Sequence, residues 1–258
     1  MMALIRLDHT PVTTKVNYPV YIILPDPGQM NGIPVRERKV LYLLHGLSDD
    51  GSAWQRYTAI ETYARSYGLV VVMPSFGRSF YMDLEIGQAY FSYLVDELPR
   101  YLEEVFGIVP RRENTLIAGN SMGGYGTLKA ALTYPERYFA AASFSGLVSM
   151  ALLGHMPADD PRRDEFTIIF GDPSTLPGSE HDPIYWLQRA AQNPKALPNL
   201  FVYCGKQEDL YPINLQFVSA CRSLGVQVEY EEYDGTHTWP YWDQKIQKFL
   251  SSVLKPLA

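Results

Sequence analysis

The sequence predicts an α/β protein with a mostly parallel central sheet and helices on both faces. Short apolar stretches typical of buried strands alternate with longer amphipathic stretches of helical period along the 258 residues. A Gly-x-Ser-x-Gly turn at 119–123 joins one such strand to one such helix. Neither an internal repeat nor a low-complexity linker interrupts the pattern, so we expect residues 1–258 to form a single domain.

The composition is that of a globular protein with a large core. Apolar residues make up 47% of the chain and charged residues 19%, which excludes a disordered chain. The net charge is -6 and basic residues form only short clusters, so we expect no nucleic-acid partner. No apolar run has the length of a membrane-spanning helix, and the N-terminus lacks the pattern of a secretory signal. We therefore expect a cytoplasmic protein without membrane contact.

The first part of the chain is expected to supply four strands and two helices. Apolar residues dominate four strand-like runs, which are 5–9, 15–24, 39–44 and 69–73. Apolar residues at helical spacing indicate a helix over 52–67. A second helix has its expected core face between Leu94 and Val105 and ends at Gly107.

Residues 115–126 carry the motif on which the functional interpretation depends. An apolar strand at 115–118 runs into Gly119-Asn120-Ser121-Met122-Gly123, which fits the nucleophile elbow. In that turn a serine occupies a strained strand-to-helix corner, and its Oγ projects from the sheet. Side chains at Gly119 and Gly123 would collide where strand and helix nearly touch. The alternative is a glycine-rich turn with an unreactive serine.

The second half is expected to add strands at 139–144, 200–204 and 226–233 and two further helices. Between them, residues 148–198 are rich in proline, contain one strand-like run at 166–170, and end in a helix near 184–192. We expect this segment to be an insertion that covers a small pocket, the alternative being an inert excursion. Cys204 and Cys221 lack metal-ligand spacing, so we expect buried thiols and no metal.

Polar residues follow three separate predicted strands in the order Ser121, Glu208 or Asp209, and His237. A serine hydroxyl is a weak nucleophile and needs a base, which in turn needs an acid to orient it. Of the five histidines, only His237 has a strand before it, a helix after it and this place in the order. The order nucleophile, acid, base is that of α/β-hydrolases and of no other serine hydrolase fold.

An oxyanion hole is expected from two backbone N–H groups. The strand 39–44 runs into His45-Gly46-Leu47, at the position where α/β-hydrolases place the first oxyanion-hole loop. The N–H groups of Leu47 and Met122 are the expected donors. His45 precedes the nucleophile, so we expect it to pack the loop and to take no part in catalysis.

These motifs resemble those of the esterase D-like family of α/β-hydrolases, which includes S-formylglutathione hydrolases, feruloyl and acetyl-xylan esterases, and mycolyltransferases. The bacterial tributyrin esterase branch is the most similar. The resemblance covers nearly the whole chain from residue 39 and rests on Leu-His-Gly-Leu (44–47), Trp-x-Arg (54–56), Arg-Ser-Phe-Tyr (78–81), Gly-Asn-Ser-Met-Gly-Gly (119–124) and Gly-Thr-His-x-Trp (235–239). It implies an α/β-hydrolase fold and hydrolysis of short-chain acyl esters through a covalent acyl-enzyme. It also implies that no metal or organic cofactor is needed, and family members often form homo-oligomers.

The acid loop departs from the family pattern. The family usually has Cys-Gly-x-x-Asp-Phe-Leu-Tyr, and residues 204–211 match it with Glu208 in the place of the aspartate. The alignment favours Glu208 as the acid, with Asp209 as the alternative.

We therefore expect a serine carboxylesterase acting on a small-molecule ester. Alternatives are an S-formylglutathione hydrolase-like thioesterase, a feruloyl or acetyl sugar esterase, and, outside enzymes, a catalytically inactive binding scaffold. Aromatic side chains often shape such sites, although each could also belong to the core. The candidate pocket walls are Trp54, Tyr81, Trp186, Tyr211 and Trp239.

Overall fold

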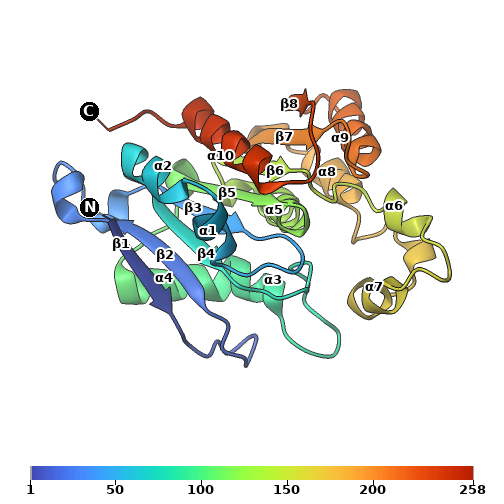
Figure 1. Cartoon of the computed structure of the whole chain (residues 1–258), viewed down its shortest axis with the longest axis horizontal. Coiled ribbons are helices and arrows are strands. Elements are labelled where there is room, and N and C mark those ends of the chain that lie inside the picture. Colours follow the sequence, from blue (N-terminus) through green and yellow to red (C-terminus); the bar gives the residue numbers. More distant parts are fainter. Residues whose placement is uncertain (1, 258) are drawn as a thin grey trace.

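Eight strands form one sheet in the computed structural model, which describes residues 2–257 (Figure 1). The spatial order is β1-β2-β4-β3-β5-β6-β7-β8. The pairs β1–β2 and β2–β4 are antiparallel, and the five remaining pairs are parallel. The mostly parallel sheet expected from the sequence is therefore confirmed. The strands are β1 (Met2–Leu7), β2 (Val20–Pro25), β3 (Val40–Leu44), β4 (Val70–Pro74), β5 (Thr115–Asn120), β6 (Ala140–Phe144), β7 (Asn199–Gly205) and β8 (Val228–Tyr233).

Helices cover both faces of this sheet. Helices α1, α2 and α10 pack on one face, and α4, α5, α8 and α9 on the other. The helices are α1 (Ala53–Tyr57), α2 (Ile60–Tyr67), α3 (Tyr90–Ser92), α4 (Leu98–Phe106), α5 (Met122–Thr133), α6 (Ala151–Gly154), α7 (Arg163–Phe170), α8 (Pro183–Ala190), α9 (Tyr211–Ser223) and α10 (Trp239–Val253). A π-helical segment, Tyr93–Glu97, joins α3 to α4. Short 3-10 turns lie at Pro27–Gln29, Val35–Glu37, Arg112–Asn114, Pro135–Arg137, Pro173–Thr175 and Pro194–Ala196.

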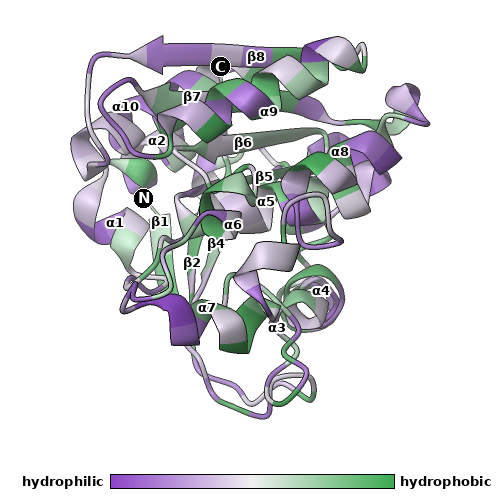
Figure 2. Cartoon of the chain, turned by 90° about the vertical axis from the view of Figure 1, so that its right-hand side faces the viewer, coloured by the Kyte–Doolittle hydropathy of each residue, from purple (hydrophilic) through white to green (hydrophobic). Residues whose placement is uncertain are grey.

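Strands β3 and β4 contain no charged or amide side chains, and both of their faces are buried. In β3, Tyr42 lies in the core on the α5 side and Leu41 in the core on the α10 side. This explains why the strand reads as a continuous apolar run and does not alternate with polar residues. The edge strand β8 is largely hydrophilic (Figure 2). Charged side chains on an edge strand oppose pairing with another chain.

Four sequence-based expectations about local structure are wrong. Residues 15–19 are not part of β2, and β1 begins at Met2. The helix expected over 52–67 is interrupted at Thr58, which has extended backbone angles, and the Ala59 N–H donates to Asp243 on α10. The strand-like run 166–170 lies in helix α7. Phe166 and Phe170 are both buried there, four residues apart, which is a helical repeat.

One residue expected on a buried helix face is exposed. Val105 lies near the C-terminal end of α4 and is 54% exposed. Both cysteines are buried and free, as expected.

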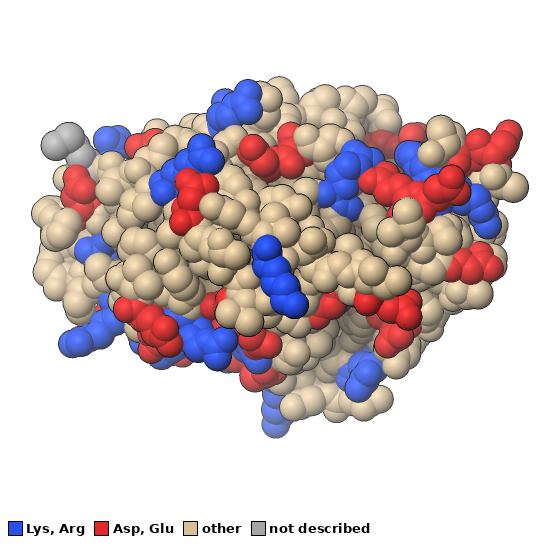
Figure 3. Space-filling model, turned by 90° about the horizontal axis from the view of Figure 1, so that it is seen from below, with Lys and Arg blue, Asp and Glu red and all other residues tan. Residues whose placement is uncertain are grey.

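The insertion 148–198 contains α6, α7 and α8. Figure 1 shows α6 and α7 to the right of the sheet, apart from the helices that cover its two faces. In the view from below, basic and acidic side chains are interspersed and form no continuous field of one sign (Figure 3). Within the part of the chain that the structure describes, no helix has both the length and the apolar character needed to cross a membrane.

Candidate active site

The turn between β5 and α5 has the geometry that the elbow motif predicts. Ser121 has φ 54° and ψ -117°, a strained backbone conformation for a residue with a side chain. A Cβ at Gly119 would lie 2.5 Å from the Gly123 carbonyl oxygen, and a Cβ at Gly123 would lie 2.3 Å from the carbonyl oxygen of Leu44. The two glycines therefore permit the close approach that brings the serine to the carboxyl edge of the sheet.

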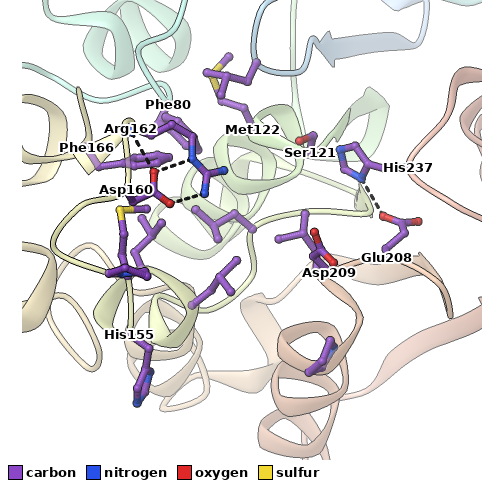
Figure 4. A pocket seen from close by; sticks show the side chains of 18 residues that line it. Phe80, Ser121, Met122, His155, Asp160, Arg162, Phe166, Glu208, Asp209 and His237 are labelled. Atoms are coloured by element: carbon purple, nitrogen blue, oxygen red, sulfur yellow. Dashed lines mark hydrogen bonds and ion pairs between the residues drawn. The ribbon is translucent and has the colours of Figure 1, made fainter. Parts of the chain in front are cut away.

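Glu208 and His237 meet beside this serine. Nδ1 of His237 lies 2.7 Å from Oε2 of Glu208. The Glu208 side chain is 1% exposed and that of His237 is 38% exposed. In Figure 4 the imidazole ring lies between the side chains of Ser121 and Glu208. The three side chains follow β5, β7 and β8, whose carboxyl ends share one edge of the sheet.

The second oxygen of Glu208 is also fully engaged. Oε1 accepts hydrogen bonds from the Ser145 hydroxyl (2.8 Å), the Gly205 N–H (2.8 Å) and the Tyr233 hydroxyl (3.1 Å). Burial by itself would raise the pKa of the Glu208 carboxyl. The bonds from His237, Ser145 and Gly205 together outweigh burial, so the net effect is a lowered pKa. The carboxylate is therefore charged at neutral pH.

Sequence reasoning missed the residues that hold this carboxylate. Ser145 directly follows β6 and has φ 50°, and Tyr233 ends β8. Trp242 donates from Nε1 to the Ser145 hydroxyl (3.1 Å) and packs edge-on against the His237 ring (4.8 Å). Their positions in the sequence were the available signal: Ser145 directly follows β6, which neighbours the nucleophile strand, Tyr233 ends the strand before His237, and Trp242 lies one helical turn into α10.

Asp209 lies elsewhere in the site. Its carboxylate is exposed and lines the cavity, and no hydrogen bond or ion pair joins it to another described residue. Figure 4 shows it apart from the contact between His237 and Glu208. Neighbouring residues in this loop point in different directions, so only one of the two acids reaches the imidazole.

The two candidate oxyanion donors, Leu47 and Met122, both line the cavity. His45 supports this loop from the core, as expected. Its Nδ1 donates to the Gly46 carbonyl (2.8 Å), and its Nε2 accepts the Phe76 N–H (3.0 Å). Complete burial lowers the pKa of the His45 imidazole to about 4. The ring is therefore neutral at pH 7, and both nitrogens are occupied by structural bonds.

A cavity of about 850 Å³ opens beside Ser121 and His237. Most of its walls are apolar, and the insertion supplies a large part of them. The residues of the insertion that line it are Leu152, Leu153, His155, Met156, Pro157, Asp160, Arg162 and Phe166. The other lining residues, besides the acids, bases and donors already described, are Phe80, Leu147, Leu210 and Pro212.

Two expectations about the insertion are wrong. The cavity is larger than the small pocket expected, and the strand-like run at 166–170 is helical. Apolar side chains are also exposed on the insertion helices, with Leu152 41% and Ile168 77% exposed. His155, a histidine of the insertion, also lines the cavity. Figure 4 places the ion pair of Asp160 and Arg162 at the end of the cavity away from Ser121.

None of the five aromatic residues expected as pocket walls lines this cavity. The polar atoms of four of them bond to groups outside the cavity, and the fifth, Trp239, packs against other aromatic rings. Trp54 donates to the Leu44 carbonyl, Tyr81 to the His45 carbonyl, Trp186 to the Glu180 carbonyl and Tyr211 to the Glu232 carboxylate, while Trp239 packs against Trp54 and Trp242. Among the described residues, the aromatic walls are Phe80 and Phe166.

Comparisons with known proteins agree with this arrangement. The family model described as putative esterase matches residues 12–252. An acetyl esterase of Caldicellulosiruptor saccharolyticus is 29% identical over 254 residues, which cover 95% of this chain and 96% of that protein. The substrate-bound structure of FphF, a fluorophosphonate-binding serine hydrolase of Staphylococcus aureus, superposes with a TM-score of 0.88 at 34% identity, covering 98% of this chain and 99% of that one. The S-formylglutathione hydrolase FrmB of Staphylococcus aureus gives a TM-score of 0.87 at 34% identity, covering 99% and 100%.

Proposed function

Because the chain belongs to the putative esterase family and is a carboxylic ester hydrolase, we propose that Ser121, His237 and Glu208 form its catalytic triad. The observation that carries the assignment is the 2.7 Å contact of Nδ1 of His237 with the buried Glu208 carboxylate, on the side of the ring away from Ser121. That contact leaves Nε2 to accept a proton from the serine. The arrangement meets the requirements of a nucleophile, a base and an orienting acid.

The reaction follows from these positions in two halves. Ser121 Oγ attacks the ester carbonyl while Nε2 of His237 takes its proton, and the N–H groups of Leu47 and Met122 stabilise the oxyanion. The imidazolium, stabilised by Glu208, then protonates the departing alcohol and leaves an acyl-serine. Water attacks the acyl-serine with His237 again as base, and the imidazolium then returns the proton to Ser121 Oγ as the carboxylic acid departs.

For the substrate we propose short-chain acyl esters. Support comes from the acetyl esterase to which the chain is similar over 95% of its length. In this proposal the segment 148–198 covers the site, and the apolar cavity beneath it takes the alcohol part of the ester. A thioester is the second candidate, because a structure at 34% identity is that of an S-formylglutathione hydrolase. The likeness to a ferulic acid esterase, at 22% identity, supports the fold alone.

We place this chemistry in the cytoplasm, where the two free, buried thiols of Cys204 and Cys221 suit a reducing compartment. Cell fractionation followed by immunodetection tests the location.

Labelling with a fluorophosphonate probe tests the proposed function. We expect one labelled serine, identified as Ser121 by peptide mass spectrometry, and no labelling of Ser121→Ala or of heat-denatured protein. Labelling at another serine would reject the assigned nucleophile. A folded wild-type protein that remains unlabelled would instead favour a binding scaffold.

A panel of p-nitrophenyl esters and matched thioesters tests the substrate. We expect kcat/KM to be highest for acetyl to butyryl groups. A value that keeps rising beyond octanoyl would mean that the cavity binds the acyl chain, since each buried CH₂ contributes about 0.8 kcal/mol. Thioesters that outrun the matched esters would favour the second candidate.

A further inference from the structure

The turn that carries the Leu47 N–H has an unusual backbone conformation. A hydrogen bond of 3.3 Å from the Asp49 N–H to the Gly46 carbonyl closes this turn. Ser48, its third residue, has φ 70°. Turns usually have glycine or asparagine at a position with positive φ, because the Cβ of other residues is crowded there. A contact from outside the turn is therefore needed to hold it.

Arg78, in the loop after β4, makes such a contact. Its Nη1 donates to the Ser48 hydroxyl at 2.5 Å. Its Nη2 lies 2.7 Å from Oε2 of Glu165 on α7, and its Nε bonds the other oxygen of the same carboxylate. The pair with Glu165 is bidentate, which fixes the orientation of the guanidinium. Since the guanidinium is planar, fixing Nε and Nη2 also fixes the direction in which Nη1 points.

The ion pair joins the insertion to the loop after β4, and the hydrogen bond from Arg78 to Ser48 links that loop to the oxyanion loop. Phe166, next to Glu165, lines the cavity and packs against Phe80, two residues after Arg78, with ring centroids 5.6 Å apart. The hydrogen bond from Arg78 lowers the pKa of the Glu165 carboxyl, so the pair is charged at neutral pH. The aromatic contact holds the two segments together, while the ion pair sets the direction of one hydrogen bond.

We propose that Arg78 is a positioning residue that couples the docking of the insertion to the geometry of the oxyanion hole. Glu165 orients the guanidinium, the guanidinium holds the Ser48 turn, and this turn directs the Leu47 N–H. This inference rests on the proposed function, in which that N–H is one of two oxyanion donors. Docking of the insertion therefore affects both the cover of the pocket and the stabilisation of the transition state.

Kinetics of Arg78→Gln and Glu165→Gln test the coupling, with Arg111→Gln as the matched control. Arg111 pairs with Glu113 away from the cavity, and its side chain is 41% exposed against 44% for Arg78. The oxyanion forms only in the transition state, so kcat should fall and KM should hold within about twofold. Complete loss of one oxyanion donor lowers kcat by about 10²–10³. A misdirected donor should cost less, so we expect kcat to fall about tenfold in Arg78→Gln and about threefold in Glu165→Gln.

Two further variants separate positioning from a general structural role. Arg78→Lys should recover little kcat, because one ammonium group lacks the planar fork that reaches Glu165 and Ser48 together. Glycine adopts positive φ without strain, so a turn with Ser48→Gly no longer needs the contact with Arg78. In that background, Arg78→Gln should lower kcat by less than about twofold relative to Ser48→Gly alone. All variants should keep the melting temperature within about 3 °C of their parents.

Three results would overturn the proposal: an unchanged kcat in Arg78→Gln, a rise in KM in place of the fall in kcat, or the same loss in the Ser48→Gly background. Failure of the proposed function has a different signature, because Ser121→Ala would then keep its activity. If only the coupling fails, Ser121→Ala remains inactive.

Discussion

Nδ1 of His237 lies 2.7 Å from the Glu208 carboxylate, while the neighbouring Asp209 makes no hydrogen bond within the described part of the chain. The two adjacent acids thus differ in burial and in hydrogen bonding. Glu208 is buried and accepts three further hydrogen bonds, whereas Asp209 faces the cavity and solvent. Glu208, which contacts the ring and is held in place by its other bonds, can keep the imidazole in one tautomer, whereas Asp209 makes no bond to the ring.

Glu208→Gln should therefore abolish most activity and Asp209→Asn should not. We expect kcat for p-nitrophenyl acetate to fall by up to ~10⁴ in Glu208→Gln, because the imidazole loses its oriented tautomer and its charged partner. Asp209→Asn, which carries the same chemical change one residue along, should stay within a few-fold of wild type. The opposite pattern would assign the acid to Asp209.

Ser121→Ala should remove esterase activity and leave stability nearly unchanged. The hydroxyl faces the cavity and makes no hydrogen bond to another described residue, so its loss should change the free energy of unfolding by less than ~0.5 kcal/mol. Residual activity ~10³-fold above water is compatible with binding and the oxyanion hole. Turnover and urea unfolding of the purified variant provide the two measurements, and near-wild-type turnover would exclude Ser121 as nucleophile.

Gly123→Ala should destabilise the protein, whereas Gly28→Ala should be nearly neutral. A Cβ at Gly123 would lie 2.3 Å from a backbone oxygen, and a Cβ at Gly28 would meet no atom within 4 Å. Backbone cannot yield as a flexible side chain does, so we expect a loss of about 1–3 kcal/mol or more at Gly123. Denaturant midpoints at pH 7 measure both variants. Equal stabilities would contradict the close packing of α5 on β3.

Acidification should destabilise the fold through His45. The folded pKa is lowered to about 4 by burial, so between about pH 6.5 and pH 4 the unfolded chain binds a proton that the folded chain does not. Stability should be independent of His45 above about pH 7.5 and should fall by up to about 3 kcal/mol as the pH drops to 4. His45→Asn should be less stable than wild type at pH 7.5, but its free energy of unfolding should fall less on acidification. Parallel pH profiles for the two proteins would show that His45 is not responsible.

Much of the fold could be predicted from local sequence, because the patterns that indicate strands, helices and turns extend over only a few residues. The apolar runs of β3, β5 and β7 and the elbow at Ser121 depend on backbone sterics and on burial of neighbouring side chains. The order Ser121, acid, His237 also needs no knowledge of distant contacts. Those features could be predicted, and the family expectation from the sequence motifs agrees with the family model.

The features that could not be predicted depend on contacts between segments that are distant in the sequence. The break between α1 and α2 depends on Asp243, which lies 184 residues from Ala59, and the run 166–170 becomes a helix because Phe166 and Phe170 pack on Phe80. Three of the expected aromatic walls, Trp54, Tyr81 and Trp186, are buried in the core, where backbone carbonyls such as that of Leu44 accept their hydrogen bonds. Only the tertiary structure brings Glu208, and not Asp209, to His237, because the directions of two adjacent side chains are set by bonds from Ser145 and Tyr233 on other strands and loops. No periodicity along the chain encodes such directions.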